Sequence, residues 1–150
     1  MVGRLVWIGL RPARRSAPVV TNEATAIAGR GLVGDRGEVR PNRVRQVTLI
    51  DAACIARVAQ RLGRDAIDPA LLRRNLVIDE VALDAARGQQ LRVGNVLLRI
   101  TGPCDPCSRM DEALGEGGCE AIHGLGGLTA IVVAGGIVRI GSTVTIEPAA

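Results

Sequence analysis

The sequence contains no lysine, phenylalanine or tyrosine, and Trp7 is its only tryptophan. Surfaces that bind single-stranded nucleic acids stack bases on aromatic side chains, so this composition argues against that class of partner. All 19 basic side chains are arginines, and with 15 acidic side chains the net charge is only +4. We therefore expect no nucleic-acid partner, and a core built from valine, isoleucine, leucine and alanine.

Long apolar runs are also lacking. A membrane-spanning helix takes about 20 apolar residues, and no stretch of this sequence approaches that length. The N-terminal stretch MVGRLVWIGLRPARRS places its apolar part before its arginine cluster, and that part is too short for a signal peptide. We expect a cytoplasmic protein with no membrane partner, whose thiols stay reduced unless they are catalytic or metal-bound.

What the sequence does contain is typical of one globular domain. The 150 residues are 47% apolar and 23% charged, and no linker, internal repeat or low-complexity stretch interrupts them. We expect residues 1–150 to form a single domain.

Short apolar runs bounded by glycine or polar turns dominate the pattern. Their length and β-branched content predict strands, at Arg4–Leu10, Gln46–Ile50, Asn75–Ile78, Val96–Thr101, Leu128–Ala134, Ile137–Ile140 and Thr143–Ile146. The stretches 93–96 and 134–137 contain glycine or asparagine and predict two-residue hairpin turns. The expected fold is mainly β with a few short helices, as an antiparallel sandwich or a closed barrel.

Three short helices are predicted. Asp51 caps the first, which carries apolar residues at helical spacing and ends at Gly63. Cys54 lies inside it and is expected to pack as a small hydrophobic residue. Asp68 and Pro69 begin a second helix, and a third is predicted from Ser108 to Gly115.

The loop before the third predicted helix carries the clearest chemical signal, a Cys-x-x-Cys pair of Cys104 and Cys107. If Ser108 caps the helix, Cys107 lies beside the helix N-terminus, where the free N–H groups and the charge of Arg109 favour a thiolate. A thiolate is both a nucleophile and a ligand for soft metals. The interpretation is that Cys107 ligates a metal or carries sulfur; the alternative is a pair of unreactive turn cysteines.

Two other uses of these cysteines are open. Cys104, Cys107, Cys119 and His123 follow the spacing C-x2-C-x11-C-x3-H, which is compatible with a tetrahedral zinc site in a non-catalytic binding module. The Cys-x-x-Cys pair is also compatible with a dithiol that cycles with a disulfide. That motif normally accompanies a βαβ pattern, which we do not expect around this loop.

Arginines and glycines cluster between Arg30 and Arg45. Glycine lets backbone N–H groups approach an anion, and guanidinium groups match phosphate oxygens in pairs. Arg73, Arg74 and Asn75 add further donors. The pattern predicts a site for a phosphorylated or carboxylated ligand, although most of the 19 arginines are expected to be ordinary surface residues.

Taken together, these segments resemble the MOSC domain, the module named after the C-terminal domain of molybdenum-cofactor sulfurases. The resemblance runs from about residue 29 to residue 144. It is carried by the order of GLVGDR (31–36), RQVTLI (45–50), RRNLVI (73–78), TGPCDPCSRM (101–110), GLGG (124–127) and GGI (135–137). It implies a strongly bent β-barrel.

The resemblance also implies a function. Family members carry sulfur on a cysteine, or bind the molybdenum cofactor (a molybdopterin) and reduce N-hydroxylated compounds with electrons from a separate redox partner. Cys107 matches the functional cysteine and is the implied metal ligand, with Cys104 as second choice. The anionic pterin cofactor would face arginines and polar side chains at Arg36, Arg45, Arg73, Arg74, Asn75 and Arg109.

Three departures bear on this assignment. Gly37 stands where the family often has histidine, so a ligand role there is absent. Cys119 and His123 fall where a bulky apolar and a basic residue are expected, which makes their zinc-like spacing accidental. The sequence lacks an attached electron-transfer or sulfur-extracting domain, so a separate redox or sulfur-donor protein is implied. The leading hypothesis is a molybdenum-dependent oxidoreductase; the alternatives are a persulfide carrier and the zinc-stabilised module.

Overall fold

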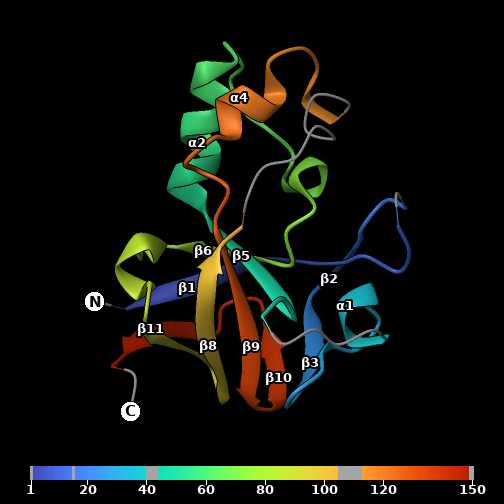
Figure 1. The fold of residues 1–150 in the computed structure, drawn as a ribbon, viewed down its shortest axis with the longest axis vertical. Helices are drawn as coiled ribbons and strands as arrows, with labels where there is room; N and C mark the ends of the chain where they lie inside the picture. The colour runs from blue at the N-terminus through green and yellow to red at the C-terminus, as the bar shows by residue number, and fades with distance from the viewer. Residues whose placement is uncertain (1, 15, 40–43, 105–112, 149–150) are drawn as a thin grey trace.

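The computed structural model describes residues 2–14, 16–39, 44–104 and 113–148. Its centre is a closed barrel of seven strands within these residues, in the order β11-β7-β8-β9-β5-β6-β1 and back to β11, with β2 added at one edge of β1 (Figure 1). The strands are β1 (Gly3–Leu10), β2 (Val19–Thr21), β5 (Val47–Asp51), β6 (Leu76–Asp79), β7 (Gln90–Val93), β8 (Val96–Pro103), β9 (Leu128–Ala134) and β11 (Thr143–Glu147). The predicted mainly β fold and the closed barrel are confirmed.

The barrel is mixed rather than antiparallel, because β5 and β6 run parallel. Parallel neighbours need a crossover connection, and α2 (Ala52–Arg61) supplies it. Asp51 caps α2 by accepting a hydrogen bond from the Cys54 N–H (2.7 Å), as the sequence predicts. The chain therefore contains one βαβ unit, although the Cys-x-x-Cys loop lies outside it.

A second, smaller sheet pairs β10 (Gly136–Arg139) with β3 (Glu23–Ile27), and β3 with β4 (Gly31–Leu32). This pairing corrects the hairpin predicted at 134–137, since β10 does not pair with β9. Gly135 packs directly on the β3 backbone, where an added Cβ would lie 2.6 Å from the Ala26 carbonyl oxygen. The other predicted hairpin, at 93–96, joins β7 and β8.

The helices outside the barrel are short. The second predicted helix is one 3₁₀ turn, η1 (Pro69–Leu72), capped by Asp68. A second 3₁₀ turn, η2, spans Leu83–Ala86, and α1 spans Arg36–Val39. Residues 113 and 114 are helical, while the start of the third predicted helix lies outside the described residues. The helix α4 (Gly118–Ile122) was not predicted.

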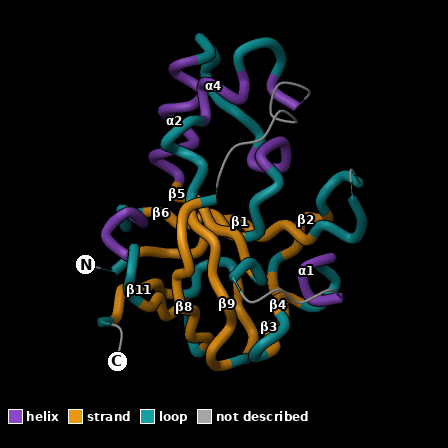
Figure 2. Tube along the Cα trace, viewed as in Figure 1, coloured by secondary structure: helices purple, strands orange, loops and turns teal. Residues whose placement is uncertain are grey.

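Two apolar cores result. The barrel core is enclosed by the strands, with fully buried Leu5, Leu49 and Leu91 among its members. The helical cap, residues 52–72 and 113–125, lies at one end of the barrel (Figure 2). It has its own core, which includes Ile122 and Leu72. Trp7 projects from the barrel strand β1 into the cap core and lies over Gly9, where an added Cβ would clash with the indole ring at 2.2 Å. No described helix is long and apolar enough to cross a membrane.

Candidate functional site

Three consecutive residues, Arg73, Arg74 and Asn75, connect η1 to the edge of the barrel and reach three different segments. Arg73 has a left-handed backbone (φ 57°), which ends the 3₁₀ turn and redirects the chain into β6. The polar side chains of the tripeptide consequently project toward separate neighbours. The contacts of each show which segments converge at this end of the barrel.

Asn75 is fully buried and joins three strands or loops. Its Oδ1 accepts from the Thr48 N–H (3.0 Å), and its Nδ2 donates to the Gly9 carbonyl (3.0 Å) and to Asp35 Oδ1 (3.0 Å). These bonds satisfy a buried amide that would otherwise be costly to desolvate. Asn75 therefore fixes β1, β5 and the 31–36 loop relative to one another.

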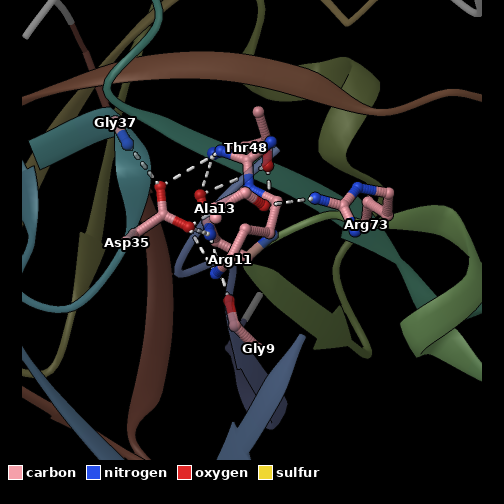
Figure 3. A network of polar contacts seen from close by, with 8 residues as sticks. Gly9, Arg11, Ala13, Asp35, Gly37, Thr48 and Arg73 are labelled. Atoms are coloured by element: carbon pink, nitrogen blue, oxygen red, sulfur yellow. Dashed lines mark hydrogen bonds and ion pairs between the residues drawn. The ribbon is translucent and has the colours of Figure 1, made fainter. Parts of the chain in front are cut away.

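Asp35 is the second centre of this network (Figure 3). Arg11 donates to it from its backbone N–H (2.8 Å) and from Nε and Nη2 (both 3.1 Å), and the Gly37 N–H adds a bond of 2.9 Å. Burial alone would raise the pKa of the Asp35 carboxyl. The hydrogen bonds and charge of Arg11 outweigh burial, so that the pKa lies below its usual value of 3.8.

Arg74 is 4% exposed and lies beneath the end of β8. Its Nε donates to the Gly126 carbonyl (2.7 Å) and its Nη1 to the Leu72 carbonyl (2.9 Å). A Cβ added to Gly126 would lie 2.4 Å from the Cys104 carbonyl oxygen and 3.3 Å from Arg74 Nη2. Only glycine fits there, and it brings the buried guanidinium next to the start of the Cys-x-x-Cys loop.

Arg73 faces the opposite way, toward the loop between β1 and β2. Its guanidinium donates to the carbonyls of Ser16 and Ala13, the latter at 3.3 Å. The predicted anion ligands Arg73, Arg74 and Asn75 thus have internal hydrogen-bond partners. They form the walls of the site by holding three neighbouring segments. Arg73 holds the loop at Ala13 and Ser16, Asn75 holds Asp35, and Arg74 holds the turn at Gly126, which lies against Cys104.

Arg36 and Arg45 are exposed, and no described carboxylate forms an ion pair with either. Arg36 is held at its backbone, because its N–H donates to the Arg11 carbonyl (2.7 Å). Arg45 follows Val44, whose carbonyl accepts a hydrogen bond from the Thr101 hydroxyl on β8. Both guanidinium groups are therefore anchored near their bases and open to an anion at their tips.

The cysteines occupy different environments. Cys104 is 3% exposed at the end of β8, and its N–H donates to the Gly127 carbonyl (2.9 Å). Cys107 and Arg109 lie outside the described residues. Cys54 is half-buried against the cap core, as predicted. Burial and the neighbouring Asp51 carboxylate raise the pKa of the Cys54 thiol to about 12, which makes it a poor nucleophile.

The zinc alternative finds no support in the described part of the chain. No group of three or more histidine, cysteine, aspartate or glutamate side chains gathers there closely enough to hold a metal ion. Cys104 lies at the end of a barrel strand, Cys119 packs against the cap core and His123 is exposed after α4. The spacing C-x2-C-x11-C-x3-H therefore does not bring its described members together.

Sequence reasoning did not identify Arg11 or Asp35 as site residues, and it missed the role of the cap arginines. Arg64 on the turn after α2 donates to the Leu114 carbonyl, and Arg61 donates to the Ala121 and His123 carbonyls (both 3.0 Å). Their targets are backbone carbonyls distant in sequence, which no local motif marks.

Comparisons with known proteins agree with this architecture. The family model of the MOSC domain matches residues 36–145. The YuaD protein from Bacillus subtilis has a TM-score of 0.86 at 16% identity, covering 100% of this chain and 98% of that chain. YiiM from Escherichia coli has a TM-score of 0.72 at 17% identity, over 98% and 71% of the two chains. YiiM from Geobacillus stearothermophilus has a TM-score of 0.76 at 14% identity, over 96% and 74%.

At these identities the solved structures show a shared fold and nothing finer. A comparison with curated proteins gave no match. The family match over 110 residues, from 36 to 145, carries more weight, because it covers most of the chain, including the 73–75 tripeptide, Cys104 and Gly126, although Arg11 and Asp35 precede it.

Proposed function

From the premise that this chain belongs to the MOSC domain family, we propose that it binds the molybdenum cofactor and supports reduction of N-hydroxylated small molecules. MOSC domains are associated with binding of that cofactor. The observation that carries the proposal is the convergence at residues 73–75. That tripeptide ties the segment holding Arg36 and the segment holding Cys104 to one end of the barrel.

The donor set at this end fits the chemistry of the cofactor. Its anionic tail suits the exposed guanidinium groups of Arg36 and Arg45, since guanidinium and phosphate form paired, charge-assisted hydrogen bonds. Its metal suits a thiolate, and the Cys104–Cys107 pair begins where β8 ends. When bound, the cofactor supplies the electron chemistry.

The protein side chains have separate tasks in this proposal. Cys107 would ligate the metal as a thiolate, with Cys104 the second candidate, and the charge of Arg109 would favour that thiolate. Arg36 and Arg45 bind the anionic tail. Arg73, Arg74 and Asn75 keep the surrounding segments in place and complete the cofactor-facing wall, so that the tail and the metal ligand are held at a fixed separation.

The direct test is the composition of the purified protein. We would produce it in a host that makes the molybdenum cofactor, and measure molybdenum, zinc, pterin and cyanolysable sulfur. The same measurements on Cys107→Ser and Cys104→Ser identify the ligand, and Cys54→Ala is the matched control. We expect molybdenum and pterin in equal amounts in the wild type and in Cys54→Ala, and loss of molybdenum in Cys107→Ser.

Each other outcome assigns a different function. Sulfane sulfur on Cys107 without molybdenum would indicate a persulfide carrier. Stoichiometric zinc without pterin would indicate the zinc-stabilised module and overturn the proposal. Molybdenum retained in Cys107→Ser but lost in Cys104→Ser would move the ligand to Cys104.

A further inference from the structure

The backbone on the C-terminal side of Arg45 is fixed by Gln46, which is 5% exposed. The Gln46 N–H donates to the Ala130 carbonyl (2.9 Å), and its side-chain Oε1 accepts from the Val132 N–H (2.9 Å), so both bonds reach β9. Its Nε2 donates to the Gly29 carbonyl (3.1 Å). The segment that carries Arg45 is therefore joined to the barrel wall and to the turn before β4.

The segment that carries Arg36 lies against the same residue. An added Cβ at Gly37 would be 3.0 Å from the Gln46 carbonyl oxygen, which is closer than an ordinary van der Waals contact. Glycine at this position therefore lets the two backbones approach each other. Arg36 precedes one residue of this contact and Arg45 precedes the other, so the two exposed guanidinium groups come from adjoining segments.

The backbone on the N-terminal side of Arg45 is held by Thr101 on β8. The Thr101 hydroxyl donates to the Val44 carbonyl, and its Oγ1 lies 2.8 Å from the Thr129 Oγ1 on β9. A carbonyl only accepts and each hydroxyl has one proton, so Thr129 donates to Thr101 and Thr101 donates to Val44. These two bonds in series tie Val44 to two paired strands of the barrel, and Thr129 at their inner end is 8% exposed.

Thr101 occupies a β-bulge at the end of β8. The register shifts between residues 100 and 102, whose partners on β9 are the consecutive residues 130 and 129, so Thr101 is the extra residue. A bulge redirects a side chain, and here the redirected hydroxyl reaches the neighbouring 44–46 segment. Pairing resumes after the bulge, and the Cys104 N–H donates to the Gly127 carbonyl (2.9 Å). Thr101 thus links the strand that ends at Cys104 to the segment that carries Arg45.

We propose that Thr101 is a positioning residue of the cofactor site, which holds Arg45 in a fixed place relative to Cys104. The inference rests on the proposed function, in which Arg45 binds the anionic tail. Thr101 acts only through the backbone of residues 44–46 and is not itself a ligand. A guanidinium whose backbone is fixed on both sides loses less conformational freedom when it binds an anion. Removal of the hydroxyl should therefore weaken anion binding although every anion ligand is still present.

The test is a double-mutant cycle between Thr101 and Arg45, with inorganic pyrophosphate as the probe. Binding is measured by calorimetry on protein produced in a host that cannot make the molybdenum cofactor. The variants are Thr101→Val, Arg45→Ala and the two combined, and Thr101→Ser restores the hydroxyl. Thr145→Val on β11 is the matched control, because it makes the same substitution on a barrel strand that carries neither Arg45 nor Cys104.

We expect Arg45→Ala to weaken pyrophosphate binding about tenfold and Thr101→Val about fivefold, with Thr101→Ser and Thr145→Val within about twofold of the wild type. The combined variant should bind no more than about twofold more weakly than Arg45→Ala, because Thr101 acts only through that arginine. A purely structural role would weaken binding equally in both backgrounds. Thermal unfolding checks that each variant folds; if Thr101→Val does not, Thr129→Val interrupts the same two bonds.

A second measurement uses protein loaded in a host that makes the cofactor. After removal of free cofactor by gel filtration, Thr101→Val should release pterin about fivefold faster than the wild type, because its anionic tail is held less firmly. Thr101→Ser and Thr145→Val should release it at the wild-type rate. The release rate is followed by pterin fluorescence and does not depend on turnover.

Four results would overturn the proposal. They are no pyrophosphate binding by the wild type, unchanged binding in Thr101→Val, equal weakening by Thr101→Val with and without Arg45, and equal pterin release from Thr101→Val and the wild type. Protein that takes up neither molybdenum nor pterin would instead overturn the proposed function alone. In that case the pyrophosphate cycle still decides whether Thr101 positions Arg45, since it does not involve the cofactor.

Discussion

The barrel and the helical cap are stabilised in different ways. The barrel closes through strand pairing and through a buried network centred on Asp35 and Asn75, whose partners are distant in sequence. The cap is a small apolar cluster whose 113–125 segment is held to α2 by the exposed side chains of Arg61 and Arg64. The candidate site lies where the two meet. The wall of the site on the barrel side is therefore held by buried bonds, and the wall on the cap side depends on weaker surface contacts.

The largest expected effect is removal of the Asp35 carboxylate. In Asp35→Ala, Arg11 and the Asn75 amide lose their shared acceptor inside the protein, and breaking such a pair costs about 3–5 kcal/mol. Urea unfolding followed by circular dichroism should show this loss for the whole barrel. A loss below about 1 kcal/mol would mean that the network does not hold the barrel wall.

Asp35 also predicts acid sensitivity. Its folded pKa lies below the unfolded value, so the charged form stabilises the fold above about pH 4, and that contribution disappears as pH falls through the folded pKa. The midpoint of urea unfolding should therefore drop at low pH in the wild type, and Asp35→Ala should flatten that part of the curve. An unchanged acid dependence in the variant would assign the effect to another carboxylate.

The cap should respond more locally. Ile122 is fully buried in the cap core, and Ile122→Ala leaves a cavity that typically costs about 2–4 kcal/mol. Because the cap has its own core, we expect hydrogen exchange to accelerate in residues 52–72 and 113–125 and much less in the barrel strands. Equal acceleration throughout would show that cap and barrel unfold as one unit.

A smaller effect is expected from the cap arginines. Arg61 donates to two carbonyls at the C-terminal end of α4, those of Ala121 and His123, and Arg61→Ala should cost about 1 kcal/mol because the carbonyls can turn to water. Arg57→Ala, on the same helix, is the control. Thermal unfolding measures the loss, and an effect as large as that of Asp35→Ala would contradict the contrast between the two walls.

The smallest effect concerns Cys54. Burial raises its pKa to about 12 in the folded protein, above the ordinary value of 9.0, so the unfolded chain loses its thiol proton first and stability falls between pH 9 and 12. Cys54→Ala should cost no more than about 1 kcal/mol at neutral pH and should reduce this alkaline loss. At pH 8, Cys54 should react with a thiol reagent more slowly than in the urea-unfolded protein.

The sequence predicted the elements whose causes are local. The seven predicted strands are present within one or two residues, and Asp51 and Asp68 cap helical turns where their side chains and the following residues require it. The sequence did not predict β2, β3, β4 or β7, although the hairpin predicted at 93–96 requires a strand before Val93. Two of these strands, β2 and β3, had weak local signals. In β3 the buried residues are only Ala24 and Ala26, and β2 is largely exposed, so neither shows strong apolar alternation.

Non-local partners account for the errors. The 134–137 turn looked like a hairpin because its glycines permit one, but Gly135 is needed for close contact with β3. Arg73, Arg74 and Asn75 were recognised as polar residues near the site. Their acceptors are carbonyls at positions 13, 16, 126 and 9, and no spacing rule in the sequence connects these positions. The roles of Cys107 and Arg109 stay predictions.

Trp7 gives this molecule an internal spectroscopic reporter. With no tyrosine and no second tryptophan, all near-ultraviolet emission comes from one indole. That ring is anchored on β1, over Gly9, and its body lies in the cap core. Its emission wavelength should therefore report whether the cap is seated on the barrel, without a label or an engineered residue, during loading with metal or encounter with a partner protein.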